Sequence, residues 1–298
     1  MEDVEGLAAR RRTIEHLIGL LDAIRSVAEI AWRRAEQRFQ PLALYHTHLR
    51  TVLTHVLAAL SSEERNTILR GDADGRPTGV LFVTSERGLC GPFNERVVAY
   101  GLQQVRALTA QGQVVQLLCL GNRGRRLLQA AKHSLLYTKA LPSLAIPSYV
   151  EIESIALDLL AFVEQRTIGR LLVVHNAPVR RFQYGATCRT LFPPDIEAPQ
   201  RAPERVVVKP ARDLPTLTTH LLTEHLLVEL YQVVIESALS EQLARVYTMR
   251  LATENARKLV DQLTLDYNLA RSHAVTQSLL EIIAGYDATT EHEKDDDA

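Results

Sequence analysis

The feature that most constrains the fold of this chain is a long C-terminal stretch without helix breakers. Between Leu214 and Ile283 there is no glycine, and Pro215 is the one proline. A helix of roughly 70 residues would extend over about 100 Å. Apolar side chains recur along it at steps of three and four residues, the spacing of a coiled-coil seam: Met249, Ala252, Ala256, Leu259, Leu263, Tyr267, Ala270 and Ala274. A lone helix cannot bury such a seam, so the stretch must pair with another long helix.

The first 60 residues are the one other segment with a long helical pattern. They contain a single proline, Pro41, and apolar residues continue at helical spacing on both sides of it, so we interpret Pro41 as a kink and not an end. The apolar positions before it are Leu17, Leu20 or Leu21, Ile24, Val27, Ala28, Ala31 and Ala35, and those after it are Leu42, Tyr45, Leu49, Val52, Leu53 and Val56. We predict that the two terminal helices form an antiparallel two-helix coiled coil.

The segment between the helices has a different pattern. Short apolar runs at 79–85, 113–120 and 169–176 alternate with helical patterns and short connections. This alternation is typical of a small parallel α/β domain of Rossmann-like type. The stretch from 191 to 210 is rich in proline and is expected to be loop or edge strand.

The predicted fold class is therefore α/β plus a long coiled coil, in four segments. We expect an N-terminal coiled-coil helix over 1–70, an α/β domain over 71–212 and a C-terminal coiled-coil helix over 213–286. "RGDADGRPTG" at 70–79 is expected to be a loop. The residues from 287 to 298, with "EHEKDDDA" at their end, form an acidic tail that we expect to be disordered.

Composition excludes several classes of protein. The formal net charge is −1, which gives no reason to expect nucleic acid or an anionic membrane as a partner. The three cysteines are far apart, which predicts neither a disulfide framework nor a cysteine zinc site. The N-terminal residues are too charged for a signal peptide, and no apolar run is long enough to span a bilayer, so we expect a cytoplasmic chain without direct membrane insertion.

The stretch "TSERGLCGPFN" at 84–94 is the first candidate for chemistry. It joins a predicted strand to a predicted helix and contains Gly88, Cys90, Gly91 and Asn94. Free amides at a helix N-terminus can bind an anion, and a cysteine there can act as a nucleophile. The stretch lacks the lysine of a P-loop, and "LGNRGRRLL" at 120–128 repeats the arrangement, so we favour a structural turn.

Histidines do not indicate a metal site by their spacing. His46 and His48 lie on different helix faces, and His48 and His55 are two turns apart. "DADG" at 72–75 is a fragment of a calcium loop without the remaining ligands, and we interpret it as a solvated turn. We expect no cofactor and no metal.

Three stretches together carry a resemblance to a known family. "VTSERGLCGPFN" and "LGNRGRRLL" resemble the strand-to-helix joints of the α/β domain in gamma subunits of rotary F-type ATP synthases. Residues 236–283 resemble the C-terminal helix of that family nearly end to end, and the three-part plan agrees over almost the whole chain. The matching positions of this helix are Ser240, Glu241, Ala244, Arg245, Met249, Ala252, Thr253, Asn255, Ala256, Leu263, Tyr267, Asn268, Arg271, Thr276, Gln277, Glu281 and Ile282.

The resemblance implies a rotor shaft that catalyses nothing itself. It implies that the coiled coil sits inside a ring of alpha and beta subunits, and that the α/β domain rests with the epsilon subunit on a membrane ring of c subunits. It implies ATP synthesis or hydrolysis coupled to hydrogen ion transport, or to sodium transport. It also implies a peripheral membrane protein at the cytoplasmic face of a bacterial plasma membrane.

The chain departs from the family pattern at the ring contacts. Asp22 stands where the family has a lysine, and Ile24 and Ser26 stand where it has methionines. Near the other end, Ser272 and Ser278 replace larger polar residues. By resemblance, the contacts with the ring are assigned to Asp22, Ile24, Arg271, Thr276 and Gln277.

Two other readings remain open. One is an α/β protein that binds a nucleotide or another anion and dimerises through a coiled-coil stalk. The other is a generic coiled-coil scaffold.

Overall fold

The computed structural model describes residues 4–61, 63–65, 75–142, 147–180, 183–195 and 213–296. The chain divides into two compact units. The smaller unit combines residues 1–26 with 249–298, and the larger unit covers 27–248. Two helices run through both units, namely α1 (Val4–Ala59) and α6 (Leu214–Asp296).

The larger unit contains a five-stranded sheet with the strand order β3-β2-β1-β4-β5. Its strands are β1 (Thr78–Val83), β2 (Val115–Leu120), β3 (Tyr137–Lys139), β4 (Arg170–Arg180) and β5 (Gln183–Phe192). The first four are parallel to their neighbours, but β5 pairs with β4 in the antiparallel direction. The prediction of a parallel sheet is therefore wrong at this edge, and the sheet is mixed. Only residues 181 and 182 separate β4 from β5, and so short a connection joins antiparallel strands only.

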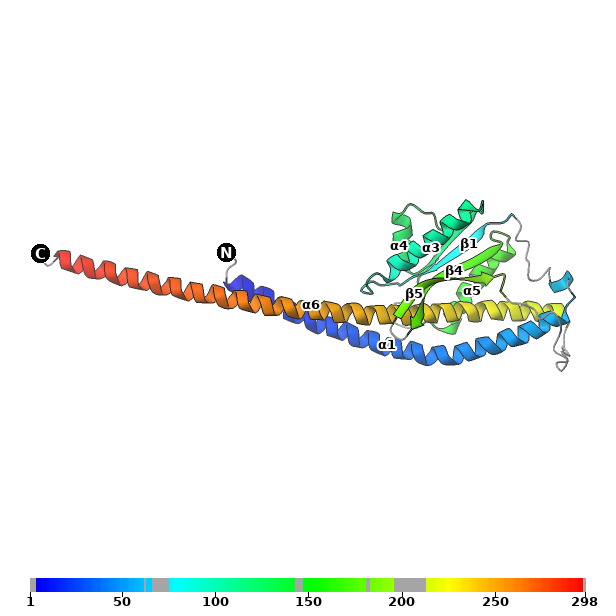
Figure 1. Ribbon diagram of the computed structural model, residues 1–298, viewed down its shortest axis with the longest axis horizontal. Coiled ribbons are helices and arrows are strands. Elements are labelled where there is room, and N and C mark those ends of the chain that lie inside the picture. Colours follow the sequence, from blue (N-terminus) through cyan, green and yellow to red (C-terminus); the bar gives the residue numbers. More distant parts are fainter. Residues whose placement is uncertain are drawn as a thin grey trace. The chain divides into compact units, whose positions relative to one another are not determined.

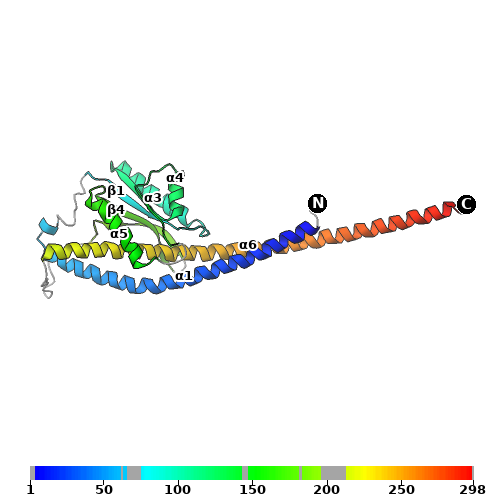
Figure 2. The same ribbon diagram turned by 180° about the vertical axis from the view of Figure 1, so that it is seen from behind.

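Helices cover both faces of this sheet. On one face, the side chains of Val80 and Phe82 pack with residues of α3 (Phe93–Ala110) and α4 (Asn122–Ala130). On the other face, Leu81 and Val83 pack with residues of α5 (Tyr149–Glu164) and with α6 near Leu230. Figures 1 and 2 show these two layers from opposite sides. The first part of α6 therefore belongs to the core of the α/β domain as well as to the coiled coil.

Helices α1 and α6 pair in the antiparallel direction within each unit. In the larger unit, Leu53 and Leu57 of α1 pack with Leu222 of α6, and Ala35 packs with Leu239. In the smaller unit, the Arg11 guanidinium lies 5.5 Å from the centre of the Tyr267 ring, and Asp22 lies 3.7 Å from Arg257. Residue numbers rise along one helix as they fall along the other, so the predicted antiparallel coiled coil is confirmed.

The seam of α1 follows part of the predicted stripe. Ala28, Ala31 and Ala35 are buried, and α1 continues through Pro41 as predicted. Leu17 and Val27, which the prediction placed in the seam, are exposed. Apolar residues occupy more than one face of α1, and only the packed partner decides which of those faces is buried.

The end of α6 differs from the prediction. The helix reaches Asp296, so the tail expected to be disordered over 287–298 is helical except for two residues outside the described part. No proline or glycine follows Gly285, and the charged residues there are compatible with a helix. Ala274, predicted in the seam, is exposed, as are all side chains from 271 to 283, because the opposite helix begins at Val4.

Two predicted loops lie partly outside the described residues, and Thr78 and Gly79 at the end of the first belong to β1. Residues 70–74 of the first loop and 196–210 of the proline-rich stretch are not among them. Among the described residues, no helix combines the length and the hydropathy needed to cross a bilayer.

Candidate functional site

The stretch 84–94 forms a tight joint between β1 and α3. The side chain of Asn94 accepts a hydrogen bond from the Ser85 amide at 2.9 Å and donates one to the Ser85 hydroxyl at 2.9 Å. Leu89 and Gly91 have positive φ angles of 64° and 57°, the left-handed region that glycine adopts most readily. The hydrogen bonds of Asn94 and the left-handed backbone at Leu89 and Gly91 thus fix the conformation of this turn.

Cys90 lies inside this turn, and its side chain is buried. It packs with Phe93 and with Ala244 of α6, and its sulfur lies 3.5 Å from the Asn94 side-chain nitrogen. Burial raises the pKa of the Cys90 thiol. The thiolate is the nucleophilic form, so this environment works against a reactive cysteine.

The two glycine-containing joints pack against each other. A Cβ atom at Gly121, whose φ is 91°, would lie 2.3 Å from the carbonyl oxygen of Thr84. A Cβ atom at Gly88 would lie 2.2 Å from the guanidinium of Arg123. Close packing against backbone and a positive φ therefore require glycine at Gly121, whereas at Gly88 the flexible Arg123 side chain could move aside.

A carboxylate of the chain itself occupies the N-terminus of α4. Glu86 accepts hydrogen bonds from the Asn122 amide at 3.1 Å and from the Leu141 amide at 3.3 Å, and the Asn122 side chain also donates to it. A free phosphate would have to displace this carboxylate from the helix N-terminus, where an anion is favoured.

The turn also docks onto α6. The Arg245 side chain is buried and donates to the Gly88 carbonyl at 3.2 Å and to Glu241 at 2.6 Å. A Cβ atom at Gly91 would approach the Thr248 hydroxyl to 2.8 Å. The turn is thus a point at which the α/β domain is attached to the long helix.

A second attachment is a buried ionic network. The His175 Nε2 of β4 lies 3.0 Å from a Glu236 oxygen of α6, and Arg189 of β5 donates to the same oxygen at 2.8 Å. Burial lowers the pKa of His175. Burial alone would raise the pKa of Glu236, but the contacts with His175 and Arg189 outweigh it and hold that pKa below its usual range. A neutral histidine and an ionised glutamate therefore join the sheet to the helix.

The residues assigned to ring contacts lie in the smaller unit. Asp22 is half-buried, 3.3 Å from Arg25 and 3.7 Å from Arg257 of α6. Ile24 is also half-buried, whereas Arg271, Thr276 and Gln277 are exposed. Gln277 donates to Glu281 at 3.2 Å within the helix. The structure brings Asp22 to α6, but it leaves the other polar candidates on an open helix face.

The structure also brings together residues that sequence reasoning did not connect. His46 of α1 lies beside His225 and Glu229 of α6. The spacing of histidines within α1 carried no signal of this group, because two of its members belong to the other helix. The i, i+4 spacing of His225 and Glu229 was the one available signal.

Comparisons with known proteins agree with this architecture. The family model described as ATP synthase matches residues 4–289. An ATP synthase gamma chain of Ruegeria sp. (strain TM1040) is 26% identical over 97% of this chain and 100% of its own length. One of Nitrosomonas eutropha is 27% identical over 92% of this chain and 95% of its own length.

Solved structures show the same fold. The rotor of the Euglena gracilis mitochondrial ATP synthase contains a chain with a TM-score of 0.63 at 15% identity, covering 91% of this chain and 98% of that chain. The central stalk and c-ring of the Tetrahymena thermophila mitochondrial ATP synthase contain one with a TM-score of 0.56 at 16% identity, covering 78% of this chain and 99% of that chain. Since the family model spans nearly the whole sequence, the chain belongs to the ATP synthase family, in which the relatives named above are gamma chains.

Proposed function

We propose that this chain is the gamma subunit and central rotor shaft of an F-type ATP synthase. The observation that carries the proposal is the antiparallel pairing of α1 and α6 around an inserted α/β domain, in a chain that matches the family over residues 4–289. A shaft must resist bending and twisting, and two long helices with a shared buried seam are stiffer than one. The turn at 88–94 and the network around Glu236 attach the α/β domain to this shaft.

The partners follow from the proposed role. The end of α6, with exposed Arg271, Thr276 and Gln277, would face the ring of alpha and beta subunits, with Asp22 and Ile24 contributing from α1. The α/β domain would contact the epsilon subunit and the membrane ring of c subunits. The chain would then work as a peripheral subunit at the cytoplasmic face of a bacterial membrane, coupling proton or sodium flow to ATP synthesis or hydrolysis.

In this proposal the chain has no catalytic residues, and Gly88, Cys90, Gly91 and Asn94 are structural. The raised pKa of Cys90 and its burial support a packing role. The carboxylate of Glu86 at the start of α4 weighs against the alternative of an anion-binding α/β protein with a dimerisation stalk, because it occupies the position that the anion needs.

The test is to purify the tagged full-length chain from native membranes in mild detergent and to identify its partners by mass spectrometry. We expect alpha, beta, epsilon and c subunits in the preparation, together with ATPase activity. The tag expressed alone is the control. Recovery of the chain as a homodimer that binds ATP, without alpha and beta subunits, would support the anion-binding alternative and exclude the shaft.

A further inference from the structure

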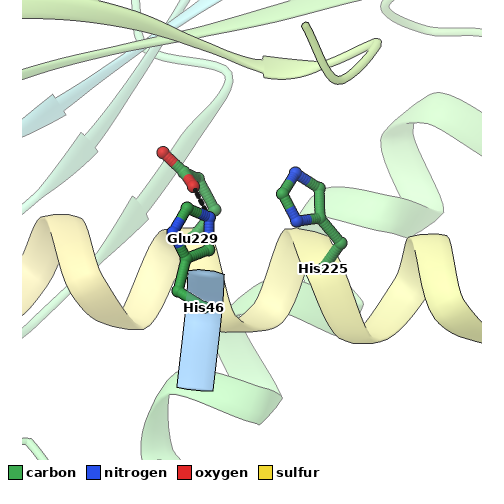
Figure 3. A group of neighbouring side chains, drawn as sticks. All are labelled: His46, His225 and Glu229. Carbon is green, nitrogen blue, oxygen red and sulfur yellow. Dashed lines mark ion pairs between the residues drawn. The ribbon is translucent and has the colours of Figure 1, made fainter. Parts of the chain in front are cut away.

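Three metal-binding side chains meet where α1 and α6 pair in the larger unit. One ring nitrogen each of His46 and His225 and one carboxylate oxygen of Glu229 all lie within 4.8 Å of one another. Figure 3 shows that His46 reaches the group from one helix and that His225 and Glu229 come from successive turns of the other. Residues four apart share a helix face, so α6 presents both of its ligands in one direction.

His225 has the burial and the unpaired ring nitrogen expected of a metal ligand. Its side chain is buried, and its Nδ1 has no hydrogen-bond partner among the described residues. Buried polar atoms are almost always satisfied, so such an atom needs an explanation. Burial lowers the pKa of His225 to about 4, which leaves the ring neutral at pH 7 with a lone pair for a cation.

We propose that His46, His225 and Glu229 form a binding site for Zn²⁺ that joins α1 to α6. Two imidazoles and one carboxylate are a recurrent protein ligand set for zinc, with water completing the tetrahedron. The site uses none of the residues assigned to the shaft's partners, and it does not depend on the proposed rotor role.

The geometry needs only a small adjustment to hold the ion. His46 Nε2 and Glu229 Oε2 lie 2.5 Å apart, whereas two ligands of one tetrahedral zinc ion are separated by roughly 3.4 Å. The imidazoles of His46 and His225 are stacked, with centroids 5.4 Å apart and planes 15° from parallel. One ring must therefore turn about its Cβ–Cγ bond so that both lone pairs point at the ion, and the Glu229 carboxylate must move by about 1 Å.

A neighbouring cation orients the carboxylate for this role. Arg189 of β5 lies 3.7 Å from Glu229 Oε1, which leaves Oε2 directed toward His46. Outer contacts of this kind fix the direction of metal ligands. The positive charge of Arg189 also works against a divalent cation, but Arg189 is shared with Glu236 at 2.8 Å.

An ion could reach the site from solvent. A groove of about 450 Å³ along α1 is lined by His46, Arg50 and neighbouring threonines. A separate cavity of about 250 Å³ is lined by His225 together with residues of α5 and β5. These spaces also give the imidazole rings room to turn.

Zinc binding would link α1, α6 and β5, which contact one another at this site through side chains only. An ion held by α1 and α6 binds the folded helix pair and not the separated helices, so it stabilises the pair by mass action. Because Glu229 is also in contact with β5, the clip would secure the start of the coiled coil to the α/β domain.

The test uses the purified full-length chain, stripped with EDTA and exchanged into chelator-free buffer. Zn²⁺ is titrated by calorimetry, and Co²⁺ is used as a spectroscopic probe. We expect one tight site per chain, visible Co²⁺ bands of a tetrahedral centre without a thiolate charge-transfer band, and a melting temperature raised by several degrees with Zn²⁺.

Single variants locate the site. His46→Ala, His225→Ala and Glu229→Gln should each weaken Zn²⁺ binding at least tenfold and abolish the thermal shift, whereas His48→Ala on α1 should bind Zn²⁺ like the parent. Circular dichroism verifies that each variant keeps its helix content. If His225→Ala loses helix content, the decision rests on His46→Ala, which removes the less buried of the two histidines. Absence of a tight site in the parent, or unchanged binding in His46→Ala and Glu229→Gln, would overturn the proposal.

Discussion

At the scale of single residues, the turn between β1 and α3 is the most sensitive point of attachment. Gly91 has a φ of 57°, and an added Cβ would lie 2.8 Å from the Thr248 hydroxyl. Gly112 offers a matched control, because its φ is 79° but an added Cβ would meet nothing within 4 Å. Gly112→Ala should cost about 1 kcal/mol from backbone strain alone, and Gly91→Ala about 2 kcal/mol or more from strain and clash together. Urea unfolding of the two variants measures the difference, and equal costs would show that the turn does not press on α6.

Protonation of His175 should weaken the buried network as the pH falls. The folded-state pKa of His175 is lowered by burial, so the unfolded chain takes up the proton first. The stability is therefore present above the unfolded pKa, near 6.5, and is lost as the pH falls through the folded value. The charged groups that face the imidazole of His175 are Glu236, Arg189 and Glu229. Glu236 titrates in a separate and more acidic window.

The measurement compares urea midpoints between pH 7.5 and 5.5 for the parent and for His175→Gln. The parent should lose stability over this range, and the variant should lose clearly less. His48→Gln, an exposed histidine on α1, should follow the parent. An identical slope in the parent and in His175→Gln would show that His175 does not titrate with folding.

At the scale of elements, the coiled coil buries one face of α6 and leaves another face exposed. Leu263 is buried at 3% exposure, whereas Leu265, two residues later on the same helix, is 66% exposed. Leu263→Ala should cost about 3 kcal/mol because it leaves a cavity in the seam, and Leu265→Ala should cost less than about 0.5 kcal/mol. Hydrogen exchange of the α6 amides near these residues reports the local opening. Equal protection in the two variants would mean that Leu263 does not pack against α1.

At the scale of the whole molecule, the end of α6 is open: every side chain from 271 to 283 is exposed in the described chain. Under the proposed function, Arg271 would contact a carboxylate of the surrounding ring through paired charge-assisted hydrogen bonds. Arg271→Ala should lower the number of ions pumped per ATP in reconstituted vesicles by several-fold, with assembly retained. Arg271→Lys, which keeps the charge but not the fork of donors, should fall between that variant and the parent. Normal coupling in Arg271→Ala would remove this contact from the proposal.

The sequence alone determined the two long helices and the main strand-helix alternation between them, but not where each helix ends, because breakers and periodicity are local properties. The absence of glycine between Leu214 and Ile283 and the step of three and four residues were sufficient to predict α6 and its partner. Family resemblance, carried by residues 83–94 and 236–283, predicted the architecture over nearly the whole chain. The signals that failed were also local: α1 carries apolar residues on several faces, and acidic residues without a breaker at 287–296 were mistaken for disorder.

Only the tertiary structure decided which residues meet. The burial of Ala28 and the exposure of Val27 depend on which face of α1 meets α6, and the antiparallel direction of β5 depends on its pairing with β4. The carboxylate of Glu86 at the start of α4, and the group of His46 with His225 and Glu229, join residues far apart in the sequence. Such contacts follow from the packing of whole elements, and the spacing of residues within one element carries no record of them.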